Sequence, residues 1–187
     1  MMQSQTRGKS DSQAGSHVNP QTLRTKRLAL SAMFAALALI FSYVEAIIPF
    51  SVGIPGIKLG IANLVIIIAL YEMNGKFALI INVVRILVAG LLFNGLFGAL
   101  YSLAGGLVSL GVMWALRKTG LFSMVGVSMA GGVAHNLGQL LVAALIVSNM
   151  KMFLYFPILM FSGIASGILI GIVAYIIDAK VPKQLFR

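Results

Sequence analysis

The chain has 187 residues, of which 59% are hydrophobic and only 10% are charged. Soluble domains carry about 25% charged residues, so this composition excludes an ordinary soluble protein and predicts an integral membrane protein of one domain. The absence of cysteine excludes disulfides and cysteine metal sites, and the net charge of +10 comes from basic residues that flank apolar segments, which indicates membrane topology rather than nucleic-acid binding.

Residues 1–23 are polar, rich in Ser, Gln, Thr and Gly, and have no apolar periodicity. We expect them to form a disordered tail that includes His17, and we assign residues 24–187 to the membrane domain. The first apolar stretch starts only at Leu28 and has no clear small-residue cleavage site after it, so the tail is not expected to be a signal peptide.

Six apolar segments follow the tail, and together they predict an all-α integral membrane protein with six transmembrane helices. They cover residues 28–48, 59–72, 76–93, 96–116, 123–148 and 153–177. A spanning helix needs about 20 apolar residues, so the second segment is too short to span without help from its neighbours.

Residues 52–64 separate the first two segments and cannot belong to an ordinary spanning helix. Pro55 and Gly56 end a helix, and Lys58 places a charge in an otherwise apolar run. Irregular backbone at membrane depth survives only where protein or a watery cavity covers it. We therefore expect residues 52–64 to form the rim and lid of a pocket.

The lysines and arginines are distributed unequally between the two sides of the membrane. With a cytoplasmic N-terminus the outer side holds only Lys58 and Lys151, and Arg85 lies within the third segment. The inner side then holds all the others: Arg7, Lys9, Arg24, Lys26, Arg27, Lys76, Arg117, Lys118, Lys180, Lys183 and Arg187. This bias predicts that both termini are cytoplasmic and that residues 52–64 face outward.

Polar residues within the apolar segments gather in the outer half of the predicted bundle. Because such residues are costly in a membrane, they are candidates for substrate binding. The candidates are Lys58, Asn63, Glu45, Arg85, Asn94, His135, Asn136 and Gln139. Two cations against one acid leave a surplus positive charge, which suits a small anionic or zwitterionic ligand.

Structural explanations remain open for the same side chains. Glu45 and Arg85 could neutralise each other, and Lys58 could extend to the outer headgroups. Asn136 and His135 could simply hydrogen-bond within the bundle, as could Asn82, a further polar residue of the third segment.

Two rows of small residues predict close helix contacts. Gly163, Gly167 and Gly171 recur every four residues in the sixth segment, which favours helix packing within the bundle. Ala32 and Ala36 lie one turn apart in the first segment, and this pair suits either bundle packing or docking against another membrane subunit.

Motifs for catalysis are absent from the sequence. There is no Walker-type phosphate loop, no His/Glu metal constellation and no assignable Ser/His/Asp set. The acids are scattered at Asp11, Glu45, Glu72 and Asp178, which gives no Asp clusters to hold magnesium and diphosphate. We expect neither an enzyme nor a cofactor, and the position of Glu45 near an edge disfavours a proton-coupled carrier.

Two motifs resemble those of a known family. The stretch Lys26-Arg27-Leu28-Ala29 leads into Ala32 and Ala36, and Gly56-Ile-Lys-Leu-Gly-Ile-Ala-Asn63-Leu opens the second segment. Over about residues 24–180 the chain resembles the small membrane proteins called heptaprenyl diphosphate synthase component I, or the Gx transporter family. That family is in turn similar to the substrate-capture (S) components of energy-coupling-factor (ECF) transporters.

The resemblance implies an S-component-like bundle in the bacterial cytoplasmic membrane. Its alanine row, matched by Ala32 and Ala36, would dock on a transmembrane coupling subunit, and separate ATPase subunits would supply energy. Substrate would lie near the outer face, at positions matched by Lys58, Asn63, His135, Asn136 and Gln139. Glu45, Arg85 and Asn94 are candidates from polarity alone.

A second interpretation stays open. The chain could be a non-catalytic membrane subunit associated with isoprenoid or quinone synthesis, or with an extracytosolic redox system. In either role it would contact the lipid bilayer and no nucleic acid.

Overall fold

The computed structural model describes residues 20–48 and 60–182, and this part of the chain is helical throughout, with no strand. Its elements are α1 (Pro20–Ile47), α2 (Ile61–Glu72), α3 (Gly75–Ala89), the π-helical turn η1 (Gly90–Asn94), α4 (Gly95–Thr119), α5 (Met124–Val147), the 3-10 helix η2 (Met150–Tyr155) and α6 (Phe156–Lys180). The expected all-α membrane fold is confirmed.

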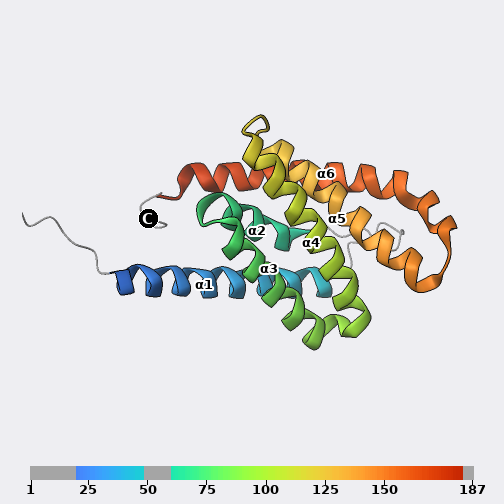
Figure 1. Cartoon of the computed structure of the whole chain (residues 1–187), viewed down its shortest axis with the longest axis horizontal. Helices are drawn as coiled ribbons and strands as arrows, with labels where there is room; N and C mark the ends of the chain where they lie inside the picture. The colour runs from blue at the N-terminus through green and yellow to red at the C-terminus, as the bar shows by residue number, and fades with distance from the viewer. Residues whose placement is uncertain (1–19, 49–59, 183–187) are drawn as a thin grey trace, which may run out of the picture.

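The helices form two groups that meet around α2. In one group α5 packs between α4 and α6, and in the other α1 packs against α2 and α3. The short helix α2 also contacts α6, so it bridges the two groups. α1 and α6 lie at opposite edges of the bundle, and the start of α1 and the end of α6 lie on the same side (Figure 1).

Five stretches of the described chain are long and apolar enough to cross a membrane, as a multi-pass membrane protein requires. They are Arg24–Ile47, Gly75–Phe93, Gly95–Thr119, Met124–Val147 and Met150–Lys180. α2 is the sixth helix, but its 12 residues reach only about 18 Å, against about 30 Å for the hydrocarbon core. The second predicted segment is therefore a helix that does not cross the bilayer by itself.

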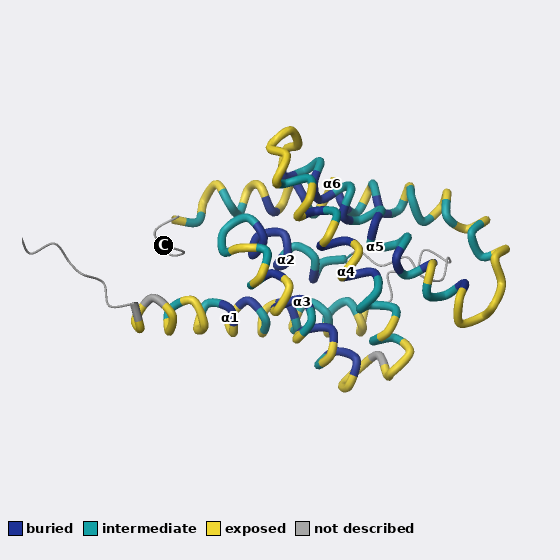
Figure 2. Tube along the Cα trace, viewed as in Figure 1, coloured by how far each residue is buried: buried dark blue, intermediate teal, exposed yellow. Residues whose placement is uncertain are grey.

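α2 forms the centre of the apolar core. Ala62 and every residue from Val65 to Leu70 are buried, and Figure 2 shows this helix as the dark centre of the bundle. The outer faces of α1 and α6 are exposed in the same view, as expected for surfaces that meet lipid (Figure 2). A helix that is apolar on all sides is stable only when neighbours surround it, and α1, α3 and α6 do so here.

The glycine row of α6 lies against α5. A Cβ atom at Gly163 would lie 2.9 Å from the carbonyl oxygen of Gly132, and one at Gly167 would lie 2.6 Å from the Cα of Met129. Gly171 is equally close to α5. Backbone therefore meets backbone along this interface, the contact that a four-residue spacing of small residues permits.

α1 presents two different faces. Ser31, Phe34 and Ala38 are buried, whereas Ala32 and Ala36 are exposed. The alanine pair therefore lies on the exposed face of α1, which is open to lipid or to another membrane protein.

The start of α1 differs from the expected boundary. Residues 20–23 were assigned to the disordered tail, but they belong to the helix, which begins at Pro20. Proline suits the first turn of a helix, because its fixed φ is helical and its missing N–H would have no partner there. Thr25 Oγ1 also donates to the carbonyl of Gln21, 3.0 Å away.

Candidate functional site

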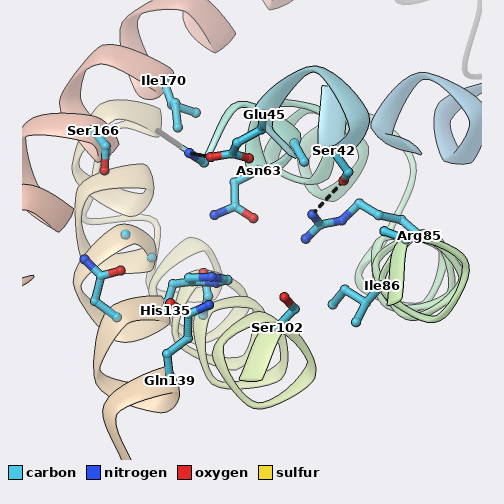
Figure 3. Close-up of a pocket in the computed structure, with 18 of the residues that line it drawn as sticks. Ser42, Glu45, Asn63, Arg85, Ile86, Ser102, His135, Gln139, Ser166 and Ile170 are labelled. Atoms are coloured by element: carbon cyan, nitrogen blue, oxygen red, sulfur yellow. Dashed lines mark hydrogen bonds between the residues drawn. The ribbon is translucent and has the colours of Figure 1, made fainter. Parts of the chain in front are cut away.

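A cavity of about 300 Å³ lies between the two helix groups. α1, α2, α3, α4, α5 and α6 all contribute to its wall, and its polar side chains point inward from several directions (Figure 3). The polar lining consists of Ser42, Glu45, Asn63, Arg85, Ser102, Ser109, Ser128, His135, Asn136, Gln139 and Ser166. Apolar and glycine residues complete it, among them Ile86, Met113, Gly131 and Ile170.

Arg85 is the cation of this cavity. Its side chain is only 9% exposed and extends from α3 toward Asn63 (Figure 3). Nη1 donates to Oγ of Ser42 on α1 at 3.3 Å, and Nη2 donates to Oδ1 of Asn82 at 2.8 Å. Both acceptors are neutral, so the guanidinium is held in place without being neutralised.

Glu45 is the acid of the cavity, and it contacts backbone rather than Arg85. Its Oε1 accepts a hydrogen bond from the N–H of Gly60 at 2.5 Å. Gly60 precedes α2 in the left-handed conformation (φ 69°), so the carboxylate lies near the positive end of that helix dipole. Among the described residues no salt bridge joins Glu45 to Arg85, although the two opposite charges lie near enough to attract each other.

The structure places some of the remaining candidates in the cavity, and others lie outside the residues that it describes. Asn63, His135 and Gln139 line the cavity with Glu45 and Arg85. Lys58 lies outside the described residues, as do most of residues 52–64, so their predicted role as rim and lid stays a prediction. Asn94 is the last residue of η1, but its side chain is outside the described part of the structure, so its role in binding stays a prediction.

The two asparagines suggested as interhelical links do bond across helices. Asn82 Nδ2 donates to the carbonyl of Gly106 on α4 at 3.1 Å, and Asn136 Nδ2 donates to the carbonyl of Leu159 on α6 at 2.7 Å. Asn136 also lines the cavity, so its link to α6 and a contact with ligand are compatible.

Five serines of the cavity wall were not among the candidates: Ser42, Ser102, Ser109, Ser128 and Ser166. A single serine in an apolar helix is an ordinary residue and gives little signal. The spacing of these serines in the sequence is a signal that could have identified some of them. Ser102 and Ser109 are seven residues apart on α4, and Ser128 and His135 are seven residues apart on α5. Residues at this spacing lie on one face of a helix.

Metal chemistry finds no support in this arrangement. In the described part of the chain no group of three or more His, Asp or Glu side chains could hold a metal ion. The cavity offers a cation, an acid, amides and hydroxyls, a set suited to binding a polar molecule.

Comparison with known proteins gives one match. No curated protein matches the chain, and no solved structure does. The family described as Heptaprenyl diphosphate synthase component I matches residues 34–177, which include the second half of α1, all of α2 to α5 and most of α6. The chain therefore belongs to the heptaprenyl diphosphate synthase component I family.

Proposed function

We propose that this protein is a membrane-embedded substrate-binding subunit, similar to an ECF S component, of an importer for a small anionic or zwitterionic molecule. The observation that carries the proposal is the buried Arg85 guanidinium, which faces a cavity with a polar lining and has no salt-bridge partner among the described residues. Ionisable groups inside a membrane protein are costly, so a buried one is by default a candidate for a ligand or ion site.

The size of the cavity favours a small molecule. A volume of about 300 Å³ corresponds to about ten water molecules and lies at the low end of ligand sites. A heptaprenyl chain is far larger, so the cavity does not suit the product that the family description names. The sequence also lacks Asp clusters that would hold magnesium and diphosphate, which supports a non-enzymatic role.

The exposed pair Ala32 and Ala36 supports docking on a transmembrane coupling subunit. Small side chains permit close approach of a second helix, and neither alanine is used within the bundle. ATPase subunits would then provide the energy, since the chain has no phosphate loop of its own. The expected location is the bacterial cytoplasmic membrane.

A tagged copy purified from native membranes in mild detergent tests this function. We expect a coupling subunit and ATPase subunits to co-purify, and Ala36→Leu to reduce that association about tenfold while the bundle stays folded. Ala165→Leu is the matched control, because Ala165 is an exposed alanine on α6. Failure to recover any ATPase subunit, with no small molecule retained, would refute the proposal.

The family description favours a second candidate, a non-catalytic subunit that assists prenyl diphosphate synthesis. Deletion of the gene separates the two. Unchanged heptaprenyl diphosphate and quinone pools exclude the second candidate, whereas loss of these products with normal solute uptake excludes the first.

A further inference from the structure

Two opposite charges, those of Arg85 and Glu45, face the same cavity without forming a salt bridge. Ser42 and Glu45 are three residues apart on α1, so they lie on one face about one turn apart. Arg85 binds the hydroxyl of Ser42, and Glu45 instead binds the backbone N–H of Gly60. The hydroxyl that binds the cation and the acid itself are therefore neighbours on α1, but the hydrogen bonds of Arg85 and Glu45 go to different groups.

Both groups also keep hydrogen-bonding capacity. A guanidinium has five N–H donors, and the described residues accept from only two of its nitrogens, Nη1 and Nη2. The Nε of Arg85 is buried and has no hydrogen-bond partner in the described part of the chain. On Glu45 only Oε1 has a partner there. Buried donors are almost always satisfied in native proteins, so a bound molecule is expected to complete this set.

We propose that the ligand is a zwitterion of the α-amino-acid type, with its carboxylate on Arg85 and its ammonium group on Glu45. The inference rests on the proposed function, because it assumes that the cavity binds a small solute. A simple anion would bind Arg85 but would be repelled by the nearby Glu45 carboxylate. A simple cation would bind Glu45 but would be repelled by the Arg85 guanidinium. An α-amino acid places both charges within a few bonds, which suits a carboxylate at Glu45 and a guanidinium held at Ser42, since these two residues lie about one helical turn apart on α1.

The rest of the ligand has room along α5. Ser128 and Gln139 both line the cavity, and they are separated by about 16 Å along the helix axis. His135 lies between them and, with Asn63 from α2, can read polar groups on the amino-acid side chain. The volume of about 300 Å³ accommodates one amino acid and excludes longer peptides.

Three probe mixtures test the inference on the wild-type protein in lipid nanodiscs. The first contains the standard L-amino acids, the second their carboxamides, which lack the carboxylate, and the third their N-acetyl derivatives, which lack the ammonium group. We expect the first mixture to raise the unfolding temperature, and the other two to need at least about tenfold higher concentration for the same shift. An equal response to all three mixtures, or no response to the amino acids, overturns the inference.

Charge variants provide the second measurement. Arg85→Gln and Glu45→Gln should each abolish the response to the amino-acid mixture. Lys76→Gln removes an exposed cation from the start of the same helix and should leave it unchanged. If Arg85→Gln does not fold, Arg85→Lys keeps the charge but loses the planar fork, and we expect it to weaken the response about tenfold. Variants that respond like the wild type would show that Arg85 and Glu45 are only structural, which overturns the inference.

The two proposals fail in different ways. If ATPase subunits co-purify but no amino acid stabilises the protein, only the ligand class is wrong. If amino acids bind but no ATPase subunit associates, the ligand class stands and the importer role falls.

Discussion

Nη2 of Arg85 donates a hydrogen bond to Oδ1 of Asn82, one turn earlier on α3, at 2.8 Å. Asn82 in turn donates from Nδ2 to the carbonyl of Gly106 on α4 at 3.1 Å. The amide is only 1% exposed, so it is a rigid link between the cavity cation and the backbone of a neighbouring helix. The orientation of Arg85 therefore depends on how α3 packs against α4.

Replacement of Asn82 by alanine removes both hydrogen bonds of this link. We expect the free energy of unfolding to fall by about 1–3 kcal/mol, because the Gly106 carbonyl and one Arg85 donor are left buried without partners. Thermal unfolding followed by circular dichroism in nanodiscs measures the change. Asn74→Ala is the control, since Asn74 is exposed and makes no side-chain cap to α3. A similar loss in both variants would contradict the role assigned to Asn82.

Two glycines should respond in opposite directions to the same substitution. Gly167→Ala places a methyl group 2.6 Å from the Cα of Met129 and should destabilise the protein by about 1–3 kcal/mol. Gly111 is exposed on α4 and has no atom within 4 Å of an added Cβ, so Gly111→Ala should stabilise it by about 0.5–1 kcal/mol through helix propensity. The unfolding temperatures of the two variants, compared with that of the wild type, measure these effects. Equal shifts would show that α5 and α6 are packed less closely than the structure indicates.

Arg117 stabilises the end of α2. Its guanidinium donates to the carbonyl oxygens of Leu70 and Tyr71, which belong to the last turn of that helix, and it lies 4.9 Å from the Tyr71 ring centroid. Hydrogen bonds from a charged donor contribute about 1.5–3 kcal/mol, so we expect Arg117→Ala to lower the free energy of unfolding by about that amount.

Lys118 provides the comparison for this experiment. Its ammonium nitrogen lies 4.1 Å from the Trp114 ring centroid at an exposed position, where a cation–π contact contributes about 0.5–1 kcal/mol. Lys118→Ala should therefore cost less than Arg117→Ala in the same unfolding assay. The reverse order would contradict a capping role for Arg117.

Ser109 tests whether a buried hydroxyl of the cavity wall contributes to the stability of the protein. Its side chain is 1% exposed, and its hydroxyl has no hydrogen-bond partner in the described part of the chain. Ser109→Ala should leave the stability of the ligand-free protein unchanged or raise it by up to about 1 kcal/mol. A clear loss of stability would mean that the hydroxyl has a structural partner, and the assay is again thermal unfolding in nanodiscs.

Much of the fold could be predicted from the sequence because membrane burial restricts the possibilities. The segment ending at Glu72 was expected to be too short to span the membrane without help, and α2 has only 12 residues. The polar candidates Glu45, Arg85 and His135 meet in one cavity because polar groups avoid lipid wherever the bundle offers an interior.

The details of the cavity could not be predicted, because they depend on contacts between distant segments. Sequence patterns left open whether Arg85 pairs with Glu45, and only the packing of α1 against α3 gives the guanidinium Ser42 instead. The continuation of the tail into α1 at Pro20 was also missed, since residues 20–23 are polar and have no apolar periodicity.

The backbone contact between α5 and α6 has a consequence for motion. Where Gly163, Gly167 and Gly171 meet α5, no side chains are available to change rotamer and absorb a sliding movement. We therefore expect α5 and α6 to move as one body, so that admission of a solute depends on displacement of the helices around this pair. The wall that carries His135 and Gln139 on α5 would then be the stationary part of the cavity.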